Sequence, residues 1–148
     1  MEVLAPFSAI KTGMQAAIAQ RLGAGVGLVQ IEAEVIPDAE MATPWVGIYG
    51  VGFTSAETIS VGRRALMTVM HRVEVAYVTM ESIEQAAARR DLAVSQVISG
   101  LMADSTLGGI CEGLLIDGGA FMSARNDQGL GFLGFASLDV AVRCRVAA

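Results

Sequence analysis

The chain has 148 residues, enough for one hydrophobic core and too few for two ordinary domains. Apolar residues make up 53% of it and charged residues only 17%, which excludes a disordered tail or a solvated helical rod. The net charge of −5 argues against the broad basic surface of sequence-specific nucleic-acid binding. With a mean hydropathy of +0.55, some apolar surface is expected to stay uncovered in a monomer, which favours an oligomer.

The first third of the sequence predicts a helix followed by two strands. Apolar residues at helical spacing indicate a helix over 8–22, with Ser8 as its N-cap and the glycine-rich stretch 23–27 as its end. Alternating apolar and polar residues over 28–35 indicate a half-buried strand. The aromatic and β-branched content of 45–51 indicates a second strand.

Residues 52–64 form the least core-like segment of the sequence. They are rich in Thr, Ser and Gly, show no period and end in paired arginines, so they predict a long loop, either a hairpin tip or a mobile segment. An ordinary exposed tip and a loop that contacts a partner both fit this composition. For the second alternative the candidate protein-interface residues are Thr54, Ser55, Glu57, Arg63 and Arg64.

The rest of the chain predicts a long central strand, a second helix and two further strands. Alternation over 66–80 indicates the strand, and an apolar stripe over 81–103 indicates the helix. Two more strands are predicted over 114–125 and 132–146. The order predicts a single α+β domain over 1–148, with two helices packed on one face of a mostly antiparallel sheet.

Several charged residues occupy positions where pairing is expected. Arg90 falls on the apolar stripe of the second helix, so either its head group reaches water at the edge of the stripe or it forms an ion pair at an interface, which adds it to the candidate interface residues. Glu32 and Glu34 share one face of the first strand, and Arg143 and Arg145 share one face of the last. Cross-strand ion pairs between them are expected if these strands are neighbours.

Few residues point to catalysis, a cofactor or a metal. Residues 129–134 match G-x-G-x-x-G, but they lead into a strand rather than a helix, so a hairpin or bulge is favoured over a dinucleotide site. His71 is the single histidine and lies on an apolar strand face, which favours a buried or interface residue over a ligand. Cys111 and Cys144 are interpreted as reduced core residues. We therefore expect no catalytic residue, no cofactor and no metal.

Neither the start of the chain nor its longest uncharged run predicts export or membrane insertion. The start lacks a basic leader followed by a long apolar core. The run over 41–56 is short for a membrane span and contains Pro44 and several glycines. The chain is therefore expected to be made in the cytoplasm and to enter no membrane.

The order of five features supports a comparison with a known family: an N-terminal helix, an aromatic strand, a long strand after a loop, a helix with a polar, glycine-containing end, and an alternating last strand. The aromatic strand reads Pro44-Trp45-Val46-Gly47-Ile48-Tyr49, and the helix ends in Asp104-Ser105-Thr106-Leu107-Gly108-Gly109. Over nearly the whole chain this order resembles the tail terminator proteins of long-tailed bacteriophages, which neck and tail-completion proteins match in size and character.

The resemblance implies a structural virion protein, not an enzyme, that assembles in the host cytoplasm as a homo-oligomer. It implies a ring, six-membered in that family, at the end of the tail tube, where it halts tube polymerisation and offers a surface for head-tail joining. The implied partners are the tail tube protein and the head-tail connector proteins, and DNA can pass through the ring without sequence-specific binding.

The competing hypothesis is a small cytoplasmic α+β enzyme or ligand-binding dimer. Its pocket would lie between helix and sheet and would involve His71, Tyr77 and Arg90. A bound metabolite, or an apolar pocket with convergent polar groups, would favour this hypothesis over the virion protein.

Overall fold

The computed structural model describes residues 6–23, 28–34, 36, 40–54, 57–60, 64–125 and 131–147, and only the backbone at 57–60, 64, 65, 146 and 147. Two helices and six strands follow one another as α1 (Phe7–Leu22), β1 (Leu28–Ile31), β2 (Trp45–Phe53), β3 (Glu57–Ser60), β4 (Arg64–Thr79), α2 (Ile83–Ala103), β5 (Gly113–Arg125) and β6 (Phe132–Ala147). The strand order is β1-β2-β4-β6-β5, with β3 paired to β4. Among these pairs only β1 and β2 are parallel.

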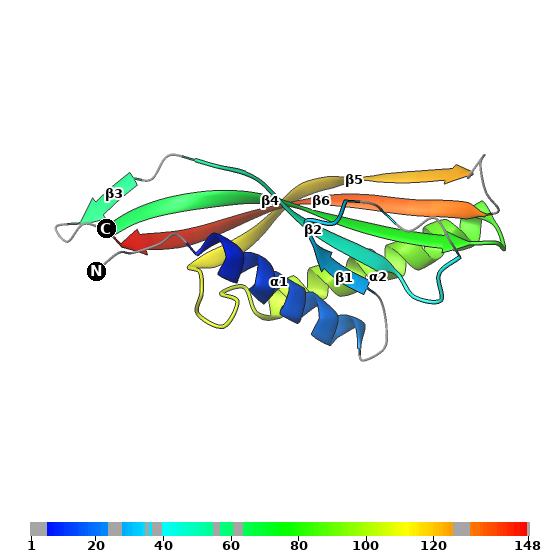
Figure 1. The fold of residues 1–148 in the computed structure, drawn as a ribbon, viewed down its shortest axis with the longest axis horizontal. Coiled ribbons are helices and arrows are strands. Elements are labelled where there is room, and N and C mark those ends of the chain that lie inside the picture. The colour runs from blue at the N-terminus through cyan, green and yellow to red at the C-terminus, as the bar shows by residue number, and fades with distance from the viewer. Residues whose placement is uncertain are drawn as a thin grey trace.

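Both helices lie on the same side of the sheet (Figure 1). The predicted α+β class, a mostly antiparallel sheet with two helices on one face, is therefore confirmed. We call the face beneath the helices the inner face and the opposite one the outer face. Beyond the first turn of α1, the backbones of β3, β4 and β6 continue as an extension that we call the arm, residues 57–60, 64–67 and 144–147 (Figure 1).

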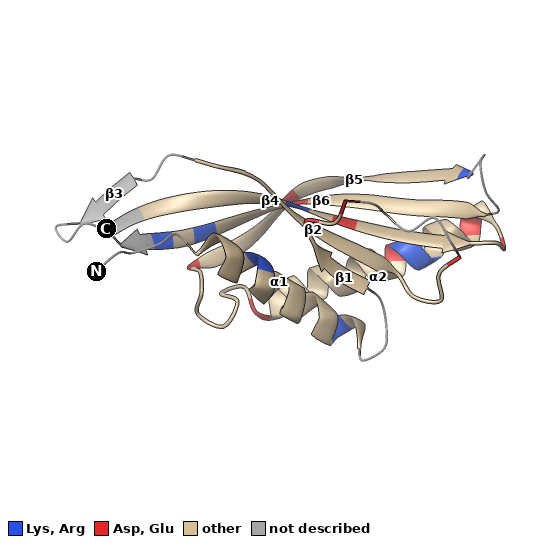
Figure 2. Cartoon of the chain, in the orientation of Figure 1, with Lys and Arg blue, Asp and Glu red and all other residues tan. Residues whose placement is uncertain are grey.

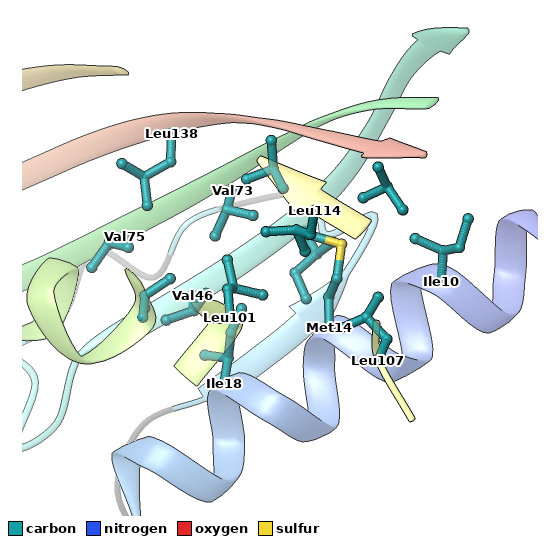
Figure 3. Close-up of a cluster of buried hydrophobic side chains, with 14 of the residues drawn as sticks. Ile10, Met14, Ile18, Val46, Val73, Val75, Leu101, Leu107, Leu114 and Leu138 are labelled. Atoms are coloured by element: carbon teal, nitrogen blue, oxygen red, sulfur yellow. The ribbon is translucent and has the colours of Figure 1, made fainter. Parts of the chain in front are cut away.

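The hydrophobic core fills the space between the inner face and the two helices (Figure 3). From α1, Ile10, Met14 and Ile18 are fully buried at helical spacing, and each contributes about 1.5–3 kcal/mol by leaving water. The strands contribute their alternate residues, so the predicted phases of the long central strand and the last strand are confirmed; these residues include Val69, Val73, Val75, Leu138, Val140, Val142 and Cys144. Cys111 and Cys144 are buried free thiols whose pKa values are raised by burial, as expected of core residues.

Two predicted element boundaries are wrong. The N-cap of α1 is Pro6 rather than Ser8, and the Pro6 carbonyl accepts a hydrogen bond from Ile10 N at 2.9 Å. The first strand ends at Ile31 instead of continuing to residue 35, because Glu32 takes a positive φ of 51° that turns the chain away from the strand ladder.

The stretch expected as a long loop over 52–64 consists mainly of strand in its described part. Gly52 and Phe53 belong to β2, and Thr54 N donates to Thr68 O at 2.9 Å. The chain then forms β3, which pairs with β4 as β2 does. The long β4 provides a ladder for this segment, which explains why its sequence shows no periodicity of its own. The hairpin alternative fits these residues, and 55, 56 and 61–63 lie outside the described part.

The expected ion pairs between the first and last strands do not form. β2 and β4 separate β1 from β6 in the sheet. Instead, the Glu32 carboxylate pairs with Lys11 Nζ at 3.1 Å and accepts a hydrogen bond from Gly50 N at 2.7 Å, which lowers the pKa of Glu32. Arg145 pairs with Glu112, in the turn before β5.

Gly134, the last glycine of the G-x-G-x-x-G match, is required by the close packing of α2 on β6. It lies in β6 beneath α2, where a Cβ atom would collide with the backbone oxygen of Ala86. The match continues directly into β6 with no helix after it, so it lacks the strand-to-helix context of a dinucleotide site. Residues 126–130 lie outside the described part.

Candidate protein interface

The outermost strand β5 carries exposed apolar side chains on both of its faces. Leu115 and Met122 are 62% and 49% exposed on the outer face, and Phe121 is 64% exposed on the inner face, opposite the buried Ala136. The side of β5 away from β6 pairs with no strand of the described chain. Exposed edge strands are usually protected by charged residues such as lysine, or by proline. The only charged residues of β5 are Asp117 and Arg125, and it contains no proline (Figure 2).

A second apolar stretch lies towards the opposite edge of the same sheet, at β2. β1 pairs with β2 only as far as Ile48, so the rest of β2 has no partner strand there among the described residues. Val51 and Phe53 are 61% and 64% exposed in this stretch, and the Phe53 ring lies 5.7 Å from that of Phe7. We call residues 49–54 and 57–60 the β2–β3 edge.

The structure brings three of the predicted interface residues together. Thr54 is exposed on the β2–β3 edge, and its hydroxyl accepts a hydrogen bond from Thr68 N at 3.2 Å. Glu57 begins β3 opposite Leu66, and Arg64 begins β4 opposite Ser60. Ser55 and Arg63 lie outside the described residues.

Arg90 belongs to neither edge surface, because its guanidinium is bound within the chain. It is 7% exposed, and Nη1 donates to Met122 O at 2.9 Å and to Ser123 Oγ at 3.0 Å. Nη2 lies 2.8 Å from an Asp91 carboxylate oxygen, and the guanidinium carbon lies 4.8 Å from the centre of the Phe121 ring. The Arg90 head group therefore does not reach water at the edge of the stripe, and its charge is paired within the chain. Arg90 joins α2 to β5.

Replacing Arg90 with methionine is expected to lower the free energy of unfolding by about 2–3 kcal/mol, because the β5 acceptors lose a charged donor. Arg89→Met is the matched control, since Arg89 is the exposed neighbour on the same helix. Chemical denaturation measures both variants. Equal stabilities for the two would contradict the role of Arg90 as a link between α2 and β5.

His71 is buried, which agrees with the interpretation from sequence. It is 1% exposed, and neither ring nitrogen has a hydrogen-bond partner in the described structure. Burial is the main reason that its pKa is lowered, so the ring is neutral at pH 7. His71 lines an open hollow of about 320 Å³ whose other walls include Phe7, Lys11 and Phe53.

Acidification below pH 6.5 is expected to reduce the stability of the protein through His71. Its folded pKa lies below the ordinary value of 6.5, so the unfolded chain binds a proton first as pH falls. The contribution is therefore complete above pH 6.5 and is lost progressively below it. Denaturation at several pH values should give a steeper loss between pH 6.5 and 5 for the wild type than for His71→Met, and parallel curves would contradict this.

The hollow at His71 does not assemble the pocket of the ligand-binding hypothesis. Tyr77 lies six residues further along β4, about 20 Å away, and neither it nor Arg90 lines the hollow. A second hollow of about 520 Å³ lies between α1 and α2, and small residues such as Gly13, Ala17 and Gly100 line much of it.

The described residues provide neither a metal site nor a helix that could span a membrane. No three His, Cys, Asp or Glu side chains among them are grouped so that they could hold a metal ion. None of the helices seen there has the length and apolar character needed to cross a membrane. No protein-family model matches the chain, and no curated protein matches it.

Proposed function

We propose that the protein is a structural virion subunit that forms a ring at the end of a phage tail tube, where it terminates tube polymerisation and presents a surface for head-tail joining. The observation that carries the proposal is the presence of exposed apolar side chains at two different edges of one sheet. Contacts between two different surfaces of identical chains are heterologous, and they close into a ring when the rotation between neighbours divides a full turn. The position of that ring at the end of a tail tube is inferred from the resemblance to tail terminators.

The projecting arm is a second observation in favour of the proposed assembly. The arm continues beyond α1 (Figure 1), and within it the backbones of β3 and β4 pair with each other. Glu57 begins β3, Arg64 begins β4, and Thr54 lies shortly before β3. Exposed Arg143 and Arg145 lie on β6 opposite Thr68 and Leu66 of β4, and Figure 2 shows blue on β6 towards the arm. The Arg143 side chain can bind a carboxylate of a neighbouring subunit or of the tube, whereas Arg145 already pairs with Glu112.

Tube length in the presence of the protein tests the proposed function. The tail tube protein of the same phage is polymerised alone and with increasing amounts of the ring protein, and tube lengths are measured by electron microscopy. Shorter tubes with a distinct cap at one end are the expected result. Tubes of unchanged length without caps, at a molar excess of the protein, would contradict the function.

Replacing both Arg63 and Arg64 with glutamate is expected to weaken assembly while leaving thermal stability nearly unchanged. The sequence predicts both arginines in a polar segment outside the core, where charges contribute little to folding, whereas glutamates there would repel carboxylates on the partner surface of an acidic protein. A melting curve is measured beside the tube-capping assay. A large loss of stability would show that these arginines support the fold, and undiminished capping would show that they lie outside the interface.

A further inference from the structure

We propose that β5 of one copy pairs in antiparallel fashion with the β2–β3 edge of the next copy, so that a single β-sheet continues from subunit to subunit. The inference deepens the proposed function and rests on it, since it names the surfaces that close the ring. It is carried by the directions of the strands, by the apolar residues at both edges and by the hydrogen-bonding groups of the edge backbones.

The strand directions make the two edges compatible. β2 and β6 both run antiparallel to β4, and β5 runs antiparallel to β6. β5 therefore runs in the direction of β4 and opposite to β2. When copies with the same orientation are placed side by side around an axis, β5 of one meets β2 of the next with opposite direction. That is the arrangement an antiparallel ladder requires, and each inner face continues into the next inner face.

The apolar side chains indicate that the partner lies beside β5 rather than on one of its faces. Leu115 and Met122 point to the outer face and Phe121 to the inner face, and all three are about half exposed or more. A surface docked on either face would leave the other uncovered. A strand added at the edge places its own side chains next to both, as neighbouring strands do within a sheet.

The strand that pairs with the β5 edge belongs to a second copy of the chain. The β2–β3 edge carries exposed Val51 and Phe53 on the side of the sheet opposite β5, and no described strand pairs with it there, although Gly50 N already donates to Glu32. Pairing of β5 with β5 across a two-fold axis would leave both Val51 and Phe53 uncovered. Joining the two different edges covers the apolar residues of both and needs no other protein.

The local geometry of β5 divides the contact into two segments. The ladder to β6 is interrupted between Ile116 and Gly119, where Gly118 takes a φ of 110°. Regular pairing is therefore expected along 113–116 and along 119–125. Met122 O already accepts a hydrogen bond from Arg90, but a carbonyl oxygen has a second lone pair.

Two edge variants and one control test the pairing. Ala120→Glu/Met122→Glu places two charges on β5, and Val51→Glu/Phe53→Glu places two charges on the β2–β3 edge. The control, Leu92→Glu/Met102→Glu, adds the same charge at residues of α2 that are 55% and 56% exposed. Each edge variant is expected to weaken subunit association by about 100-fold or more, because glutamate removes the apolar contacts between neighbouring strands and disfavours strand pairing. Circular dichroism melting verifies that all three remain folded.

Mixing the two edge variants gives the decisive result. Each variant keeps one intact edge, and these edges complement one another, so the mixture should form a one-to-one dimer and nothing larger in analytical ultracentrifugation. The control should assemble like the wild type. Two results would overturn the edge pairing but leave the ring function standing. In the first, the wild type and both edge variants assemble fully. In the second, the edge variants stay monomeric when they are mixed. A wild-type protein that neither self-associates nor caps tubes would overturn the proposed function itself.

Discussion

Val140→Asp is expected to lower the free energy of unfolding by about 4 kcal/mol or more. Val140 is fully buried at the middle of β6, between His71 on β4 and Ile116 on β5. The His71 ring beside it is neutral, because burial lowers its pKa. An aspartate at this position must bury a carboxyl group in the core, and a hydrogen bond to an unpartnered ring nitrogen of His71 would offset only part of that cost, so the folded state is weakened.

The melting temperature of this variant should fall by roughly 10 °C or more for a chain of this size. Asp139→Asn is the matched control, since Asp139 is the exposed preceding residue on the opposite face of β6. The control should change the melting temperature very little. A Val140→Asp variant that melts within a degree or two of the parent would mean that the inner face of β6 has been assigned to the wrong residues.

Gly134→Val is expected to lower the free energy of unfolding by about 2–3 kcal/mol, because it prevents α2 from approaching β6. A Cβ atom at this position would overlap the Ala86 backbone oxygen and lie 3.0 Å from the Arg90 Cβ. Backbone atoms cannot rotate away as a side chain can, so the first turns of α2 must shift outward.

Gly113→Val is the control for the loss of glycine itself. Gly113 begins β5, and a Cβ atom there would meet no other atom within 4 Å. Valine also suits a strand, so the control should be as stable as the parent or more so. Denaturant titrations compare the two variants. If Gly134→Val were as stable as the control, the close packing of α2 on β6 would be wrong.

The elements that bury one continuous face could be predicted from the sequence. In β4 and β6, alternate residues such as Val73 and Val140 face two helices, and this burial produces the period-two pattern. In α1, the helical spacing of Ile10, Met14 and Ile18 reflects the same core. The α+β class follows from the order of these strongly patterned segments.

The edges and the long-range partners could not be predicted in the same way. β3 is only four residues long and is placed by its pairing with β4, so its sequence is too short to carry a clear period. Arg90 lies on the apolar stripe of α2, but its acceptors lie on β5, more than thirty residues away in the chain. Local spacing contains no information on such a pair.

One signal in the sequence could have identified the β5 edge. Leu114 and Ile116 are buried or half-buried, and the intervening Leu115 is apolar as well, as are Phe121 and Met122 side by side. Apolar residues on both faces of a strand indicate either a central position or a partner at the edge. The alternation expected of a half-exposed strand is missing there, and the structure shows that β5 is the outermost strand.

The native mass of the purified protein tests the ring most directly. Native mass spectrometry at increasing concentration should show one dominant closed species at six times the chain mass of 15.4 kDa, with no continuing series of larger assemblies. Electron microscopy of the same sample should show rings in end view. A protein that remains a monomer or a two-fold dimer, in solution and in the presence of tail tubes, would contradict the account.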